Sequence, residues 1–210
     1  MSEHPFTATL RAAEAHLSAA CPRLAPVIDR VGPCTLTPTT DVFAATVRAV
    51  VAQLISTAAA QTISGRVLAA VGGKLTPARL LAVPEAKLRA CGLSGAKFRS
   101  LRAVAELFAG TRGMNRKLLA ATDEEVRDTL LPLPGIGPWT LDMLLMFSLG
   151  RPDVLPVGDY GIRAGAQELF RLKSLPDPAK LTKVTAVWRP FRTVACWYLW
   201  RSRGWSGKQA

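Results

Sequence analysis

Two glycines and one later carboxylate carry the clearest chemical signal in this sequence. Residues 133–140 read LPGIGPWT, a pattern typical of a tight turn between two helices. Glycine lets the backbone approach a ligand closely there. The start of the next helix presents free N–H groups that can donate hydrogen bonds to phosphate oxygens. Asp159 follows after one apolar stretch and a loop containing proline and glycine, so the chain can bring its carboxylate back toward the turn. This combination predicts chemistry on DNA.

The charge of the chain favours a polyanionic partner. The formal net charge is +12, and residues 171–210 hold nine Lys or Arg against a single acid, Asp177. Lysine and arginine that neutralise phosphates release condensed counterions, which drives binding to nucleic acid. A basic segment can equally be a solvated, solubilising face. On charge alone both interpretations stay open.

The four cysteines predict neither a metal centre nor a disulfide framework. Cys21, Cys34, Cys91 and Cys196 show no C-x-x-C or histidine-paired spacing. Each lies in an apolar context, where a free buried thiol is the common outcome.

No stretch reaches the roughly 18 apolar residues that a membrane span needs, and the first residues lack the apolar core of a signal peptide. We therefore expect a cytoplasmic, nucleoid-associated monomer with no membrane partner.

The 210 residues, 49% of them hydrophobic, predict an all-α protein, because helical periodicity dominates and strand-like alternation is scarce. Caps and prolines place most of the helix starts. We expect helices near 6–19 and 23–31, then one from Asp41 to about Leu54 capped by Thr40, with Leu54 on its apolar face. Further helices should begin after Ser56, Thr76, Pro84, Ser94 and Thr122, then at Trp139, at Asp159 or Tyr160, and after Asp177. The last should begin around Pro190 and run to about Arg203.

Four motifs together resemble the HhH-GPD superfamily of DNA glycosylases. The hairpin with its following Asp159 resembles the features that name the family. Val50–Ser56 resembles its helix-break motif, Gly92-Leu93-Ser94 with Lys97 its G-L-S-x-x-K signature, and Trp188–Thr193 with Trp200 its C-terminal helix. Within the superfamily the chain is most similar to 3-methyladenine DNA glycosylase II.

The resemblance implies a helix-hairpin-helix DNA glycosylase fold, a compact helical body with an active-site cleft between two helical subdomains. Residues 41–210 would form the glycosylase domain, with the hairpin at 131–140, and residues 1–40 would add N-terminal helices packed on the core. The implied activity is base excision repair of double-stranded DNA. The enzyme would hydrolyse the N-glycosidic bond of alkylated purines of the 3-methyladenine and 7-methylguanine type.

Asp159 is the predicted catalytic residue. Cleavage of the base–sugar bond builds positive charge on the deoxyribose, which a carboxylate stabilises, and the same carboxylate can activate water. An aspartate before a helix is more often only an N-cap. The two roles are compatible, because capping holds the carboxylate in one direction.

The predicted base pocket is aromatic. Trp139 stands where lyase members of the family carry a nucleophilic lysine, so the resemblance implies a monofunctional enzyme without lyase activity. Trp139, Met143, Tyr160 and Trp200 would line the pocket, where aromatic faces attract a cationic alkylated purine. Core packing is the alternative for any tryptophan, and we favour it for Trp188, Trp197 and Trp205.

DNA contacts are predicted on three segments. Leu54 matches the family's wedge position, which fills the space of a flipped base; its alternative is a buried leucine at a helix end. The predicted DNA-binding set comprises Gln53, Leu54, Ser56, Lys97, Gly135, Gly137, Thr140 and Arg163, with Arg99, Arg189 and Arg192 as weaker phosphate contacts. No cofactor is expected apart from a monovalent cation that the resemblance places on the main chain of Leu131, Leu133 and Ile136.

Three other functions compete with this one. A non-catalytic helix-hairpin-helix DNA-binding protein would keep the glycines and the basic surface without needing Asp159. A helix-turn-helix regulator needs a polar recognition helix, whereas residues 139–149 are mostly apolar. A glycosylase for a different damaged or mismatched base remains an alternative within the family.

Overall fold

The computed structural model describes residues 5–204, and for Pro5 and Thr57 only the backbone. All regular structure in this part of the chain is helical and no strand is present there, which confirms the all-α prediction. None of the helices between residues 5 and 204 is both long and apolar enough to cross a membrane.

The chain divides into two compact units. One contains residues 39–149, and the other combines the N-terminal residues up to Pro38 with the segment that starts at Gly150. The predicted boundary after residue 40 lies close to the first of these divisions, whereas the return of the chain at residue 150 was not predicted. Residues 1–4 and 205–210, which the predicted regions include, lie outside the described residues.

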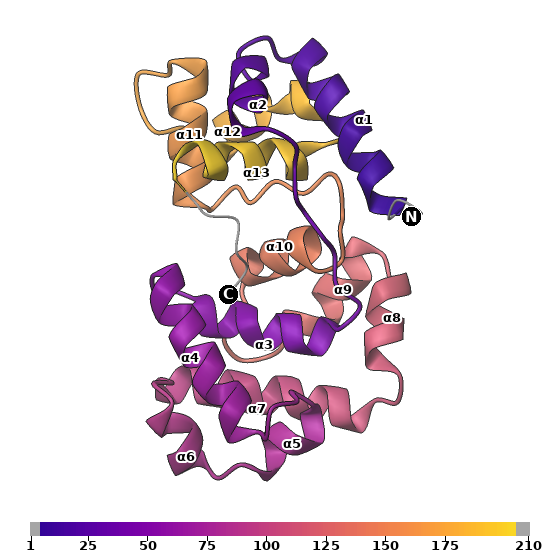
Figure 1. Cartoon of the computed structure of the whole chain (residues 1–210), viewed down its shortest axis with the longest axis vertical. Helices are drawn as coiled ribbons and strands as arrows, with labels where there is room; N and C mark the ends of the chain where they lie inside the picture. Colours follow the sequence, from indigo (N-terminus) through magenta and orange to yellow (C-terminus); the bar gives the residue numbers. More distant parts are fainter. Residues whose placement is uncertain (1–4, 205–210) are drawn as a thin grey trace. The chain divides into compact units, whose positions relative to one another are not determined.

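The central unit, residues 39–149, contains eight helices in its described sequence (Figure 1). They are α3 (Val42–Ala52), α4 (Thr57–Ala70), α5 (Pro77–Ala82), α6 (Glu85–Ala90), α7 (Gly95–Gly110), α8 (Met114–Ala120), α9 (Asp123–Leu130) and α10 (Pro138–Phe147). Helix α3 is buried along most of its length and packs against α4, α7, α8 and α10. Burying such an apolar helix stabilises this unit through the hydrophobic effect.

The other unit is built around its last helix. Its helices are α1 (Pro5–Ala20), α2 (Ala25–Val31), α11 (Tyr160–Phe170), α12 (Pro178–Val184), the 3-10 turn η1 (Ala186–Trp188) and α13 (Arg192–Ser202). Helix α13 contacts α1, α2 and α11. Trp197 is buried within it, and buried Trp188 stacks on Phe170, so the predicted core role of these two tryptophans is confirmed.

Most predicted helix starts are confirmed by side chains that cap them. The hydroxyls of Ser56, Thr76, Ser94 and Thr122 each accept a hydrogen bond from the backbone N–H three residues later, and Thr122 forms a full capping box. These caps satisfy N–H groups that the helix itself leaves without partners.

Three helix predictions were wrong. Asp41 rather than Thr40 caps α3, because its carboxylate accepts from the N–H of Ala44. The same helix ends at Ala52 rather than at Leu54, and the last helix begins at Arg192 rather than at Pro190, after the η1 turn. Helix α8 was not predicted, because no capping side chain precedes it in the sequence.

A partly buried ion pair holds the loop that follows residue 150 against α13. The Arg192 guanidinium donates from Nε to Asp153 Oδ1 over 2.6 Å and from Nη2 to Oδ2 over 2.9 Å. The hydroxyl of Thr193 donates to the carbonyl of Arg151 and accepts from the N–H of Val154. The beginning of α13 therefore holds the chain that leads to Asp159.

We expect Arg192→Ala to lower the free energy of unfolding by about 3 kcal/mol, because it removes the more buried of the two cations that pair with the Asp153 carboxylate. Arg189 is the matched control, since it also pairs with Asp153 but from a side chain that is 58% exposed. Arg189→Ala should cost less than about 1 kcal/mol. Urea unfolding measures both variants, and equal losses would contradict the structural role of Arg192.

Candidate active site and hairpin

Asp159 stands at the start of α11, at the junction of loop and helix. Its Oδ1 accepts hydrogen bonds from the backbone N–H of Ile162 over 2.8 Å and from the indole Nε1 of Trp200 over 3.1 Å. Its own N–H donates to the carbonyl of Pro156. The N-cap role considered from the sequence is therefore present, and the carboxylate is held from two directions. Its catalytic role stays a prediction.

Two other predicted site residues lie near this helix start in the chain. Tyr160, the first residue of α11, is 70% exposed. Arg163 donates from Nε to the carbonyl of Pro176 over 2.8 Å, which ties α11 to the loop before α12. This bond assigns Arg163 a structural role, and its predicted phosphate contact is not tested by it.

The hairpin needs glycine at residue 135 for two reasons. Its φ is +76°, a region that residues with a side chain rarely adopt, and a Cβ there would overlap the hydroxyl of Ser100 on α7. The turn is closed by a bond from the Ile136 N–H to the Leu133 carbonyl. Gly137 then precedes α10, and no side chain caps this helix start. Such a helix start is suited to accepting an anion in place of a cap.

The two helices of the hairpin are joined by a partly buried ion pair. Arg127 on α9 donates to Asp142 on α10 over 2.8 Å, and the Asp142 side chain is only 10% exposed. Burial raises the pKa of Asp142, and the hydrogen bond and charge of Arg127 oppose this rise. The pair was not recognised in the sequence, where the two residues are separated by the whole hairpin.

The loop between α3 and α4 is tied to the hairpin through Gln53. Its Nε2 donates to the carbonyl of Gly135 over 2.9 Å and to the hydroxyl of Thr140 over 2.7 Å. Thr140 is itself buried. Gln53 and Thr140, both predicted to bind DNA, thus bond to each other and to the hairpin.

Lys97 holds the same loop from the side of α7. Its Nζ donates to the carbonyls of Val51 and Gln53 over 2.7 and 2.8 Å, which are among the last carbonyls of α3. Desolvation lowers the pKa of Lys97. The ammonium therefore caps the end of a helix, and this role differs from the phosphate contact that the sequence suggested.

Leu54 is fully exposed. Because α3 ends at Ala52 and Leu54 has a φ of +57°, its side chain leaves the apolar face on which the sequence had placed it. Its relative exposure is 103%. The alternative of a buried helix-end leucine is wrong, whereas the wedge role stays a prediction. The next predicted DNA contact, Ser56, caps α4.

The predicted base pocket draws on both units. Trp139 and Met143 are half-buried on α10 in the central unit, whereas Tyr160 and Trp200 belong to the other unit. The pocket, and the cleft between subdomains that would contain it, stay predictions.

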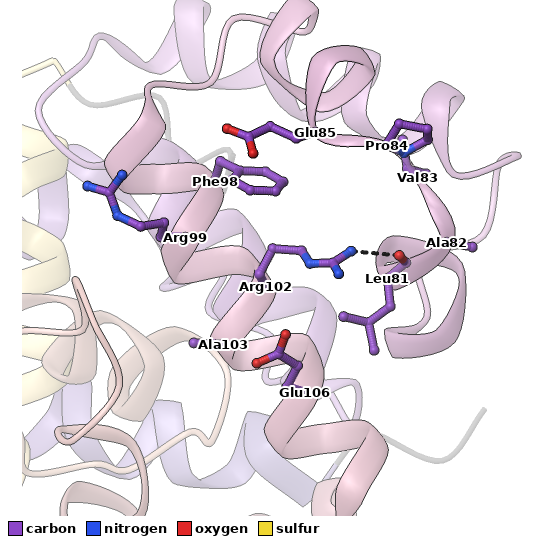
Figure 2. A pocket seen from close by; sticks show the side chains of 10 residues that line it. All are labelled: Leu81, Ala82, Val83, Pro84, Glu85, Phe98, Arg99, Arg102, Ala103 and Glu106. Atoms are coloured by element: carbon purple, nitrogen blue, oxygen red, sulfur yellow. Dashed lines mark hydrogen bonds between the residues drawn. The ribbon is translucent and has the colours of Figure 1, made fainter.

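A separate pocket of about 570 Å³ lies within the central unit (Figure 2). One wall is the α7 face that carries Phe98, Arg99, Arg102 and Glu106, and the other is the chain from Leu81 to Glu85. Arg102 crosses it and donates to the carbonyl of Leu81 over 2.6 Å. None of the predicted catalytic or base-pocket residues lines it.

The described residues form helices only and combine a glycine hairpin, an exposed leucine in the loop bonded to it and a helix-capping aspartate. This combination is typical of helix-hairpin-helix proteins that act on DNA. The family described as HhH-GPD superfamily base excision DNA repair protein matches residues 47–190. The chain therefore belongs to the HhH-GPD superfamily of base excision DNA repair proteins.

Three relatives resemble nearly the whole chain. The alkylbase DNA glycosidase-like protein mag2 of Schizosaccharomyces pombe is 31% identical, over 90% of this chain and 92% of its own length. The 3-methyladenine DNA glycosylase Mag1 of the same yeast, solved in complex with abasic DNA, has a TM-score of 0.84 at 31% identity and covers 95% of this chain and 100% of its own. A DNA-3-methyladenine glycosidase of Bacillus halodurans has a TM-score of 0.76 at 35% identity, covering 96% and 90% of the two chains.

We expect Leu54→Ala to change the free energy of unfolding by no more than about 0.5 kcal/mol, because the side chain is exposed. Leu101→Ala is the matched control, since Leu101 is fully buried and its truncation should cost about 2–5 kcal/mol. Thermal or urea unfolding measures both. If Leu54→Ala lowered the free energy of unfolding as much as the control does, Leu54 would be a buried core residue after all.

We expect the cost of Arg127→Met to depend on pH. A pKa raised in the folded state favours folding below the ordinary carboxyl pKa near 4, and this contribution is lost as the pH rises through the folded-state pKa. Without Arg127, the charge of Asp142 should lower the free energy of unfolding by about 3 kcal/mol at pH 7 and by much less at pH 4. Urea unfolding of wild type and variant at both pH values tests this.

Arg127→Lys is the control for that experiment, because it keeps the cation and should retain most of the stability at pH 7. An equal deficit of Arg127→Met at both pH values would contradict the role of a charged, buried Asp142.

Proposed function

We propose that this protein is a monofunctional DNA glycosylase of base excision repair that removes alkylated purines of the 3-methyladenine and 7-methylguanine type from double-stranded DNA. The single observation that carries the proposal is Asp159, whose Oδ1 is held by the Ile162 N–H and the Trp200 indole. Membership of the superfamily and the names of the relatives support the alkylated base as the substrate class.

In the proposed reaction the bond between C1′ and the purine nitrogen breaks, and its electron pair leaves with the base. Alkylation makes the purine a better leaving group. Positive charge develops on the sugar, and the Asp159 carboxylate stabilises it. Water then adds to C1′ and gives up one proton, for which Asp159 is the acceptor. The products are the free base and an abasic site.

Trp139 supports the water route. A lyase mechanism needs an amine that attacks C1′ and forms a Schiff base, and an indole nitrogen cannot take that role. Trp139 would instead form part of the base pocket with Met143, Tyr160 and Trp200. Aromatic faces attract a cationic alkylated purine by up to about 2 kcal/mol when the pair is desolvated.

Leu54 would occupy the space that the extruded nucleotide leaves in the duplex. An apolar side chain inserted between base steps pays for unstacking through the additional contacts of the bent DNA. Its full exposure suits this role, and the bonds from Gln53 and Lys97 to the surrounding backbone hold its loop in place. Gly135 and Gly137 would hold the phosphate backbone through their N–H groups.

The carbonyl oxygens of the hairpin are a suitable type of ligand for a monovalent cation. Leu131, Leu133 and Ile136 would contribute main-chain carbonyl oxygens, the ligands that hard cations prefer, from a turn closed by the bond from the Ile136 N–H to the Leu133 carbonyl. A cation bound there would supply positive charge next to a DNA phosphate. We further propose that the protein acts as a monomer on nucleoid DNA in the cytoplasm.

The decisive experiment measures the release of methylated purines from alkylated duplex DNA. We expect release by the wild type and a fall of at least about a hundredfold for Asp159→Asn, which keeps the shape of the side chain but removes its charge. Equal binding of duplex DNA by the two proteins is the control for folding. A wild type that binds DNA but releases no base would support the non-catalytic alternative, and release only of oxidised or mismatched bases would support the other glycosylase.

The same substrate treated with borohydride tests the water mechanism. We expect no covalent protein–DNA adduct, because no Schiff base forms. A trapped adduct would contradict a monofunctional enzyme.

A further inference from the structure

Helices α11 and α13 pack against each other (Figure 1), and two glycines of α11 face residues of α13. A Cβ at Gly165 would lie 3.2 Å from the Cβ of Leu199 on α13. A Cβ at Gly161 would lie 3.0 Å from Nε1 of Trp200 and 3.1 Å from Oδ1 of Asp159. The two glycines are four residues apart and therefore lie on one face of α11. This face lets α13 approach closely.

The hydrogen bond between Trp200 and Asp159 depends on this approach. Its two atoms, 3.1 Å apart, are the same atoms that a side chain at residue 161 would contact. Gly161 has no positive φ, so its backbone conformation does not require glycine. Alanine is the better helix former inside a helix. The reason for glycine at this position is therefore the space that the hydrogen bond occupies.

We propose that Gly161 and Trp200 are positioning residues for Asp159. The glycine keeps space for the Trp200 indole, and the indole N–H, together with the N–H of Ile162, holds Oδ1 and so fixes the direction of the carboxylate. Trp200 would then act through its N–H as well as through the aromatic face expected in the base pocket. This inference deepens the proposed function and rests on it for the role of Asp159.

The first test observes the hydrogen bond without any enzymatic assay. The indole N–H resonance of Trp200 is assigned in a nitrogen-15 NMR spectrum as the one lost in Trp200→Phe. We expect Gly161→Ala to shift this resonance and to speed its exchange with solvent. Gly158→Ala is the matched control, because a Cβ at Gly158 would meet no atom within 4 Å, and it should leave the resonance unchanged. An unchanged resonance in Gly161→Ala would overturn the proposal.

The second test separates the N–H from the aromatic face in the release of alkylated purines. Trp200→Phe keeps an aromatic ring but lacks the donor, and we expect kcat to fall roughly tenfold or more, the size of a lost hydrogen bond to a charged group. KM should stay within about threefold of wild type, since the face remains. A rise in KM at unchanged kcat would show that Trp200 contributes only to binding of the base, and it would overturn the positioning role.

A double-mutant cycle tests whether Gly161 and Trp200 act through the same hydrogen bond. Gly161→Ala should lower kcat roughly tenfold in the wild-type background but less than about threefold in Trp200→Phe, because the bond that the methyl group disturbs is then already absent. Additive losses would overturn the proposal. A wild type that releases no alkylated base would refute the proposed function, whereas the NMR test would still decide whether Gly161 and Trp200 hold Asp159.

Discussion

An α-helix leaves its first N–H groups and its last C=O groups without partners inside the helix, and this constraint decides where the functional side chains of the protein stand. Asp159 accepts from the start of α11, and the ammonium of Lys97 donates to the end of α3. The start of α10 has only glycine and proline, so no side chain caps it. The hydrogen bonds at the two capped helix ends hold Asp159 and Lys97 in place, and the uncapped start of α10 lies in the hairpin, where it suits a phosphate.

Glycine serves two different physical purposes in this chain. At Gly135 the backbone takes a positive φ and passes directly over Ser100, so both conformation and space exclude a side chain. At Gly161 the backbone is ordinary helix, and a Cβ would lie only 3.0 to 3.1 Å from atoms of the Trp200 indole and the Asp159 carboxylate. The first glycine shapes the surface that would hold DNA, and the second orders the group that would act on it.

Much of the fold could be predicted because its signals are local. A capping hydroxyl bonds an N–H three residues away, and this spacing is visible in the sequence at Ser56, Ser94 and Thr122. The hairpin and its family motifs are continuous segments for the same reason. Asp41 rather than Thr40 caps α3, and the N–H of Phe43, three residues after Thr40, donates instead to Oδ1 of Asn115, which is distant in sequence. Helix α8 was missed because its N-cap, Gly113, has no side chain that could signal a cap.

The sequence by itself determined the helical class, the hairpin, the family and the aspartate at the start of α11. Only the tertiary structure decided what several site residues do. Lys97 and Gln53 bond to backbone atoms that are distant in sequence, and Leu54 turns outward where α3 ends. The link from Gly161 through Trp200 to Asp159 joins two helices. Such contacts depend on which helices pack together, because hydrogen bonds and close packing act over a few ångströms of space, whatever the separation along the chain.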